Sequence, residues 1–116
     1  MDGLLVRGYP ASLNEYNVSI ALDRLRLDYH FQVMLNGGRE RRGGVVLDFL
    51  VFTAPKPTPV QVHGEYWHTG SHAAEDLLKE QVLRENPEWF EPVTIWGKES
   101  NTVEDALCAL RRELMI

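Results

Sequence analysis

The first periodic pattern of apolar residues in the chain follows Ser12 and is typical of a helix. Ser12 and Glu15 have the form of a capping box, in which the serine caps the helix and the glutamate three residues later reaches back to it. We predict a helix from there to about Asp28, with Glu15 on its core side. Apolar residues at helical spacing predict the buried stripe: Leu13, Tyr16, Val18, Ile20, Leu22, Leu25 and Leu27.

Three strands are predicted after this helix. The first covers residues 29–35 and ends at Asn36-Gly37-Gly38, a typical strand breaker. The second covers residues 45–52, and a proline-rich stretch over residues 54–59 then forces a connection. The third strand covers residues 60–63. The short spacing between the three strands favours an antiparallel meander.

A second helix, a fourth strand and a third helix complete the predicted order. We expect the second helix over residues 72–85, capped by Ser71 and stopped by Asn86-Pro87. A short strand over residues 92–96 follows it, and a last helix begins near residues 101–104. The buried stripe of that last helix is expected at Val103, Ala106, Leu107, Leu110 and Leu114.

The order α-β-β-β-α-β-α predicts an α/β fold with a central mixed sheet flanked by helices. The 116 residues suffice for one core, so residues 1–116 are expected to form a single domain. With 44% apolar and 25% charged residues, the composition is that of an ordinary globular protein. No run of about 18 apolar residues predicts a membrane span, and the short acidic N-terminus is unlike a signal peptide. We therefore expect an intracellular, cytoplasmic protein.

The single cysteine and the uneven charge limit the possible functions. Cys108 alone can form neither an internal disulfide nor a cysteine-rich zinc site, and its helical apolar surroundings predict a small core residue. The net charge is -5, with seven basic and six acidic residues up to Gly64 but five and eleven after it. Any contact with nucleic acid is therefore expected from the first half. Its densest basic segment supplies Arg39, Arg41 and Arg42, either as a solvated loop or as phosphate contacts.

Asp48 is the one carboxylate in the apolar segment Val45–Phe52. Burying an ionised carboxylate in such a strand costs roughly several kcal/mol of folding free energy unless a partner compensates the charge. Gln61 and His63 stand two residues apart on the next strand and so share a face. Pairing of the two strands would bring both side chains next to Asp48, and Glu15 could approach from the helix packed on the sheet.

These groups suit a magnesium site with a histidine beside it. Magnesium prefers oxygen ligands, usually one or two carboxylates together with waters and substrate phosphate. Asp48 and Gln61 would provide such ligands, helped by Glu15 or a backbone carbonyl near Val62. A neutral imidazole, from His63 or His68, could take the proton of an attacking water.

The same residues resemble a known family. Asp48, followed by Gln61-Val62-His63, is similar to the PD-(D/E)XK nuclease pattern with Gln in place of the acid and His in place of the lysine. The segment from Val62 to His68 resembles the very short patch repair endonucleases and the EDxHD homing endonucleases. The resemblance implies a restriction-endonuclease-like core over roughly residues 11–97 and a metal-dependent deoxyribonuclease that uses Mg2+ or Mn2+. The single cysteine cannot build the structural zinc site of the repair enzymes.

The resemblance also implies roles for individual residues. Asp48 would be the principal metal ligand and the carbonyl of Val62 another, with Glu15 as the acid on the helix. His68 would act as the general base and His63 as a supporting histidine. The aromatic positions that contact DNA in the repair enzymes correspond to Tyr66 and Trp67. A chain this small has limited DNA-contacting surface, so a homodimer or a larger DNA-processing assembly is a further expectation.

Other interpretations remain open at this point. The fold could serve as a DNA-binding or assembly module that no longer cleaves, or as a small-molecule or protein-binding domain. Asp48 could be a buried structural residue bonded to backbone or to an arginine, and Gln61 could close an edge hydrogen bond. Lys79 could contact phosphate or form a surface ion pair with Asp76. Two further alternatives concern side chains near the third strand: Tyr66 and Trp67 as core aromatics, and a zinc site formed by His63, His68 and His72.

Overall fold

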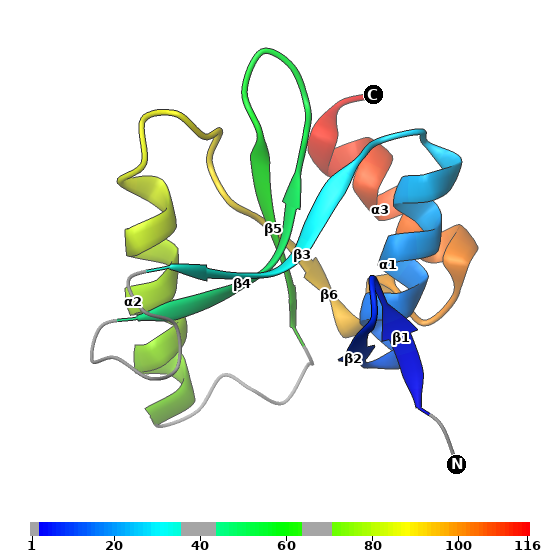
Figure 1. Cartoon of the computed structure of the whole chain (residues 1–116), viewed down its shortest axis with the longest axis horizontal. Coiled ribbons are helices and arrows are strands. Elements are labelled where there is room, and N and C mark those ends of the chain that lie inside the picture. Colours follow the sequence, from blue (N-terminus) through cyan, green and yellow to red (C-terminus); the bar gives the residue numbers. More distant parts are fainter. Residues whose placement is uncertain (1–2, 36–43, 64–70) are drawn as a thin grey trace.

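The computed structural model describes residues 3–35, 44–63 and 71–116, without the side chains of residues 71–76. Figure 1 shows a central sheet with helices on both sides of it. The chain order is a hairpin, a helix, three strands, a helix, a strand, a 3-10 turn and a helix. The elements are β1 Leu4–Val6, β2 Tyr9–Ala11, α1 Leu13–Arg24, β3 Tyr29–Leu35, β4 Val45–Val51, β5 Thr58–His63, α2 Ser71–Arg84, β6 Val93–Trp96, η2 Gly97–Glu99 and α3 Val103–Leu114.

The central sheet has four strands in the order β3-β4-β5-β6. The first three form an antiparallel meander, as predicted, and β6 pairs with β5 in parallel, so the sheet is mixed. Helix α2 crosses from the end of β5 to the start of β6 and provides the connection that parallel strands need. The prediction of an α/β fold with a mixed central sheet and flanking helices is therefore confirmed at this level.

The core is divided into two clusters, one on each side of the sheet. The larger lies under α1 and α3 and contains Phe31, Phe49 and Val60 from the strands. The smaller lies under α2 and joins Leu47 and Leu50 to Leu83. Residues two apart on a regular strand share a face, yet Leu47 and Phe49 belong to different clusters. The ribbon formed by β3 and β4 therefore turns over between these two residues.

A left-handed residue marks this turn of the ribbon. Gln32 has φ 59° in the middle of β3, a conformation that is uncommon for residues other than glycine. It lies between the pairs Phe31–Phe49 and Val33–Leu47, which places it opposite Asp48 in the register. The sequence carries no glycine here, so the pattern did not signal the distortion.

Helix α1 begins as predicted and ends earlier than predicted. Both hydrogen bonds of the Ser12 and Glu15 capping box are present. The helix stops at Arg24 rather than near Asp28, because Arg26 takes a left-handed conformation with φ 59°. The Leu27 N–H then donates to the Leu22 carbonyl at 3.0 Å, the bond typical of a Schellman ending.

Two residues that were expected in the core are exposed. Leu13 is 55% exposed because it is the first residue of α1 and lies beyond the side covered by the sheet. Cys108 is also exposed, although its neighbours Ala109 and Leu110 are buried. The stripe predicted for α3 otherwise holds, since Ala106 and Leu110 are buried and Val103, Leu107 and Leu114 are partly buried.

The other predicted boundaries shift by one or two residues, and one hairpin was missed. Strand β5 begins at Thr58 and includes Pro59, although we expected it to start at Val60. Helix α2 begins at Ser71, so this serine is its first residue and not its cap. The missed hairpin, β1 and β2, turns at Arg7 and Gly8, both with positive φ. No helix among the described residues is long and apolar enough to span a membrane.

A polar cluster joins the start of α1 to the end of β6. The Asn14 side chain donates to the Gly97 carbonyl at 2.9 Å, and the buried Asn17 donates to the Ser100 carbonyl at 2.9 Å. Glu99, in the same turn, accepts from Arg112 of α3. Burial opposes the ionisation of Glu99, but the hydrogen bonds from Arg112 and from the Trp96 N–H outweigh it and lower its pKa.

We predict that Leu83 holds α2 on the sheet. Leu83 is 1% exposed and contacts the cluster of Leu47 and Leu50, whereas Leu77 of the same helix is 68% exposed. Leu83→Ala should lower the free energy of unfolding by about 2–5 kcal/mol, because it removes buried apolar contacts and leaves a cavity. Leu77→Ala, the matched control, should change it by less than about 0.5 kcal/mol. Urea unfolding measures both, and equal losses would contradict the prediction.

Candidate functional site

The candidate site lies where β4 and β5 separate. Their ladder consists of three pairs, from Val51–Thr58 to Phe49–Val60. Beyond Phe49, β4 continues alongside β3, and beyond Val60, β5 continues alongside β6. Figure 1 shows the two halves leaving each other, with β3 and β4 directed towards α2 and β5 and β6 directed downwards. We call this point of separation the fork.

Asp48 and Gln61 close the fork with their side chains. In the register they would form the next pair after Phe49–Val60. The backbone N–H of Asp48 donates to Gln61 Oε1 at 3.2 Å, and the backbone N–H of Val62 donates to Asp48 Oδ2 at 2.8 Å. Each side chain thus replaces a carbonyl that the other strand no longer offers. The structure places Asp48 next to Gln61, as the predicted strand pairing requires.

These bonds also realise two of the structural alternatives. Asp48 accepts from backbone, and Gln61 accepts a hydrogen bond at the place where the ladder ends. A carboxylate that receives a backbone N–H is compensated for part of its desolvation. The presence of Asp48 in an apolar strand therefore has a structural reason that is independent of any chemistry.

His63 belongs to the same edge of the sheet as Gln61. Val60 and Val62 contact the cluster under α1 and α3, so Gln61 and His63 point to the opposite face by strand alternation. The His63 ring lies 5.9 Å from the ring of Trp96, its partner on β6. The structure therefore brings Asp48 and Gln61 together, and the part of the prediction that adds His63 to them stays a prediction.

Gln61 is the most deeply buried member of the group. It is 4% exposed, and its Nε2 has no hydrogen-bond partner in the part of the chain that the structure describes. Its orientation is determined by Asp48, because exchanging the amide O and N would oppose two donors. The oxygen therefore faces the Asp48 N–H, and the NH2 group remains as a buried donor.

Glu15 is engaged in its capping box. Its Oε1 accepts from the Ser12 N–H at 2.8 Å, on the first turn of α1. That turn is tied by Asn14 to Gly97, directly after β6, where the strand paired with β5 ends. Glu15 therefore lies at the end of the sheet where His63 is found, with one carboxylate oxygen occupied.

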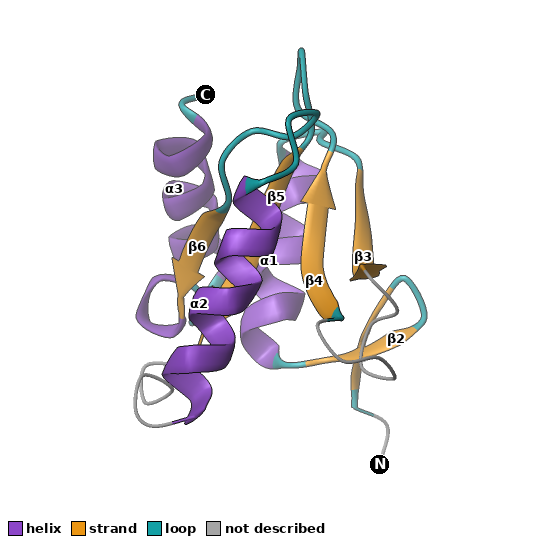
Figure 2. Ribbon diagram, turned by 90° about the vertical axis from the view of Figure 1, so that its left-hand side faces the viewer, coloured by secondary structure: helices purple, strands orange, loops and turns teal. Residues whose placement is uncertain are grey.

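Lys79 lies on the side of α2 that faces the sheet. It is one helical turn before Leu83, which packs against Leu47 and Leu50 of β4. Lys79 is partly buried and forms no ion pair with any side chain that the structure describes. Figure 2 shows α2 running along the sheet.

Several predicted site residues fall outside the description. These are His68, Tyr66 and Trp67 after β5, together with Arg39, Arg41 and Arg42 between β3 and β4. The side chains of His72 and Asp76 are also outside it, so the zinc alternative and the Asp76 ion pair lie beyond the described residues. Among the described residues, no three histidine, cysteine or acidic side chains gather as a metal site. The described donors at the fork are therefore one carboxylate with amide and backbone oxygens.

Such a donor set fits magnesium or manganese better than zinc. Magnesium is commonly held by one or two carboxylates and keeps several waters, whereas structural zinc takes four protein ligands. Asp48 supplies the carboxylate, and the adjacent backbone of Val62 offers a carbonyl. The Gln61 oxygen already receives the Asp48 N–H, so it is a weaker candidate for a ligand than the sequence indicated.

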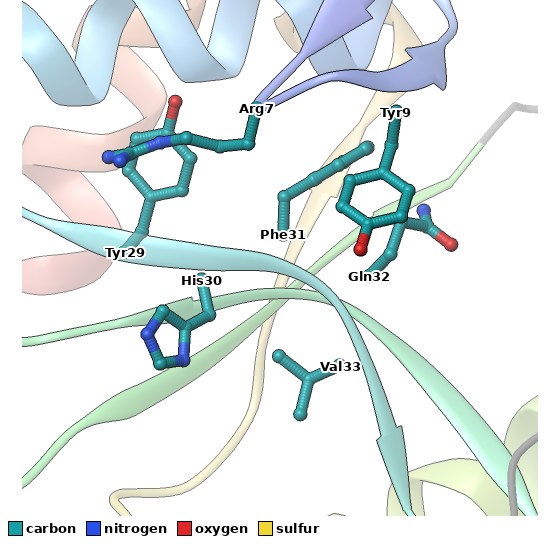
Figure 3. Close-up of a pocket in the computed structure, with 7 residues that line it drawn as sticks. All are labelled: Arg7, Tyr9, Tyr29, His30, Phe31, Gln32 and Val33. Carbon is teal, nitrogen blue, oxygen red and sulfur yellow. The ribbon is translucent and has the colours of Figure 1, made fainter.

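A concavity separate from the fork lies between the first hairpin and β3. It has a volume of about 370 Å³ and is lined by Arg7, Tyr9 and the β3 residues 29–33. Figure 3 shows Arg7 extending across Tyr29 at one end and Tyr9 with Gln32 at the other. The Arg7 guanidinium is 4.2 Å from the Tyr29 ring and 2.9 Å from the Asp28 carboxylate. Its charge is therefore paired within the protein.

The charges at this pocket stabilise each other. The pKa of Asp28 is lowered by the backbone N–H of Tyr29 and then by Arg7. The pair is exposed, with side-chain exposures of 48% and 74%, so solvent screens it strongly. The contacts of Arg7 at this pocket therefore serve to pack the hairpin against β3.

No family model, curated protein or solved structure matches the chain. The fork combines a carboxylate, a buried amide donor and an imidazole-bearing strand end within the covered face of the sheet. Carboxylate oxygens are of a kind that binds cations, and an amide NH2 is of a kind that donates to anionic oxygens.

We predict that Asp48 stabilises the fold through the Val62 N–H. Asp48→Ala removes the acceptor and should lower the free energy of unfolding by about 1–3 kcal/mol, the cost of an unsatisfied buried donor. Asp48→Asn retains a side-chain oxygen for the same N–H and should lose less. Urea denaturation of both variants measures the difference. An Asp48→Ala protein as stable as the wild type would contradict the structural role.

Proposed function

We propose that the protein is a divalent-metal-dependent DNA endonuclease whose active site is the fork. The observation that carries the proposal is the pair of hydrogen bonds that hold Asp48 and Gln61 between two separating strands. Where the strands separate, polar side chains accept from backbone N–H groups that a regular ladder would pair with backbone carbonyls. A site of this kind suits hydrolysis of a phosphodiester, because it offers a place for a cation and a place for a charged oxygen.

In this proposal Asp48 holds the metal, together with the carbonyl of Val62. Glu15 is a further candidate, whereas the Gln61 oxygen is already engaged by the Asp48 N–H. A bound Mg2+ or Mn2+ would polarise the phosphodiester and stabilise the charge that develops as the bond breaks. The support for this assignment is the position of Asp48, which is partly exposed and faces the backbone of Val62 at 2.8 Å.

Proton transfer falls to a histidine that follows Gln61. A neutral imidazole near physiological pH can accept the proton of an attacking water. His63 is the last residue of β5, and its ring lies 5.9 Å from the ring of Trp96. His68 remains the alternative base from the resemblance to the repair enzymes, and it lies outside the described residues.

Contacts with DNA are proposed around the fork. Lys79, on the inner side of α2, would bind a phosphate. Tyr66 and Trp67 would contact bases, and Arg39, Arg41 and Arg42 would add backbone contacts, as the sequence predicts. A homodimer or larger assembly would extend this surface.

The second candidate is a nuclease-like module that binds DNA without cutting it. Two observations favour it: the residue facing Asp48 is an amide where the pattern has an acid, and the described residues hold no cluster of three metal-binding side chains. In such a module, Asp48 would act only through its hydrogen bond with the backbone. The two candidates differ in whether cleavage requires this carboxylate.

We expect the wild-type protein to nick supercoiled plasmid in Mg2+ or Mn2+ and to stop when EDTA removes the metal. Asp48→Asn should reduce the rate by about 100-fold or more, since a metal ligand contributes several kcal/mol to the transition state. Asp23→Asn, an exposed carboxylate on α1, is the matched control and should cut normally. Gel electrophoresis of the plasmid forms measures the rates.

The same assay separates the two candidates. Cutting that is equal in Asp48→Asn and the wild type would exclude the fork as the active site. DNA binding without cutting in every metal tested would support the non-cleaving module.

Lys79 is expected to contribute one phosphate contact. Lys79→Ala should weaken binding of duplex DNA and reduce the slope of log K against log salt by about 1. Lys56→Ala is the control, because Lys56 precedes β5 at the end opposite the fork and lies 5.0 Å from the Phe90 ring. Fluorescence anisotropy at several salt concentrations measures both slopes. Equal slopes for Lys79→Ala and the wild type would contradict the contact.

A further inference from the structure

We infer that the carboxamide of Gln61 is a hydrogen-bond donor to a non-bridging oxygen of a phosphodiester, and not a metal ligand. The inference rests on the proposed function and specifies what one residue of the site contacts. It starts from the buried Nε2 of Gln61, which has no hydrogen-bond partner among the described residues. Unpaired buried donors are rare in proteins, and each one calls for an explanation.

The hydrogen bond from Asp48 fixes the orientation of the Gln61 amide. Gln61 Oε1 accepts from the Asp48 N–H at 3.2 Å. If the amide were flipped, its NH2 would meet that N–H and two donors would oppose each other. The NH2 group therefore points away from the Asp48 N–H and is left as a buried donor whose hydrogen bonds are unused among the described residues.

The free end of the Gln61 amide is a hydrogen-bond donor. An amide nitrogen donates hydrogen bonds and has no lone pair available for a cation, so the free end of Gln61 cannot bind metal. Its complement is an oxygen acceptor, and the strongest acceptors are anionic oxygens. A phosphate oxygen next to the Asp48 carboxylate would be repelled unless a cation lay between them, which agrees with a metal held by Asp48.

The backbone ladder between β4 and β5 ends just before Asp48 and Gln61. The last ladder pair between β4 and β5 is Phe49–Val60, and beyond it the side chains of Asp48 and Gln61 form hydrogen bonds across the fork. Side chains can adjust to an entering oxygen without breaking the sheet. Gln61 itself is 4% exposed, and a donor in such a dry place discriminates strongly between a bound acceptor and none.

Two variants of Gln61 test the inference. Gln61→Glu retains an oxygen for the Asp48 N–H, loses the NH2 donor and adds a negative charge. Gln61→Met has a similar size, stays neutral and also loses the donor. Loss of a charge-assisted hydrogen bond should raise the Kd for duplex DNA by about 10-fold or more in both variants. Fluorescence anisotropy in the presence of Mn2+ measures this Kd, and a thermal unfolding curve verifies that each variant is folded.

Binding of Mn2+ without DNA provides the second readout. Electron paramagnetic resonance of free Mn2+ should show that Gln61→Met binds the metal about as well as the wild type does, and that Gln61→Glu, which adds a carboxylate, binds it at least as well. A large loss of Mn2+ affinity in Gln61→Met would identify Gln61 as a metal ligand and overturn the inference. A Gln61→Met protein with wild-type affinity for DNA would overturn it as well, because weakening in Gln61→Glu alone would then reflect charge repulsion.

Failure of the proposed function would look different from failure of this inference. A wild-type protein that does not bind DNA removes both, and this is seen before any variant is made. A wild-type protein that binds DNA without cutting it removes the endonuclease, while the comparison of Kd values still decides the role of Gln61.

Discussion

The structure depends on the end of the hydrogen-bond ladder between β4 and β5. After Phe49–Val60, β4 stays with β3 and β5 stays with β6, so one sheet serves two separate clusters of core residues. The separation exposes backbone donors that would be costly if left unpaired. Asp48 and Gln61 accept from two of these donors. Polar side chains are required in the sheet for this reason, and any chemistry at the fork uses groups that the fold already needs.

The turning of the β3 and β4 ribbon follows from the same division. Phe31 and Phe49 contact the cluster under α1 and α3, while Val33 and Leu47 contact the cluster under α2. A regular strand cannot present residues two apart to opposite faces. The left-handed Gln32, opposite Asp48, allows the change. The distortion and the fork thus occur at one level of the sheet, and strained backbone of this kind is common at functional sites.

Local patterns predicted most elements, and tertiary packing decided the rest. The capping box at Ser12 and the span Tyr29–Leu35 depend on neighbouring residues, and both agree with the structure. The end of α1 does not, because Arg26 adopts a conformation usually signalled by glycine. The exposure of Leu13 and Cys108 depends on which side of a helix the sheet covers. The first hairpin was missed since three-residue strands give too short a pattern.

The candidate site was predictable as a neighbourhood but not as a set of bonds. Strand alternation and pairing bring Asp48 next to Gln61, yet no pattern in the sequence shows which way the amide points. That direction follows from the Asp48 N–H, which needs an acceptor only because the strands separate. Asp48 consequently has two possible roles, as acceptor for Val62 and as metal ligand, and Asp48→Ala alters both. Asparagine retains the first role and weakens the second, so it is the substitution that separates the fold from the chemistry.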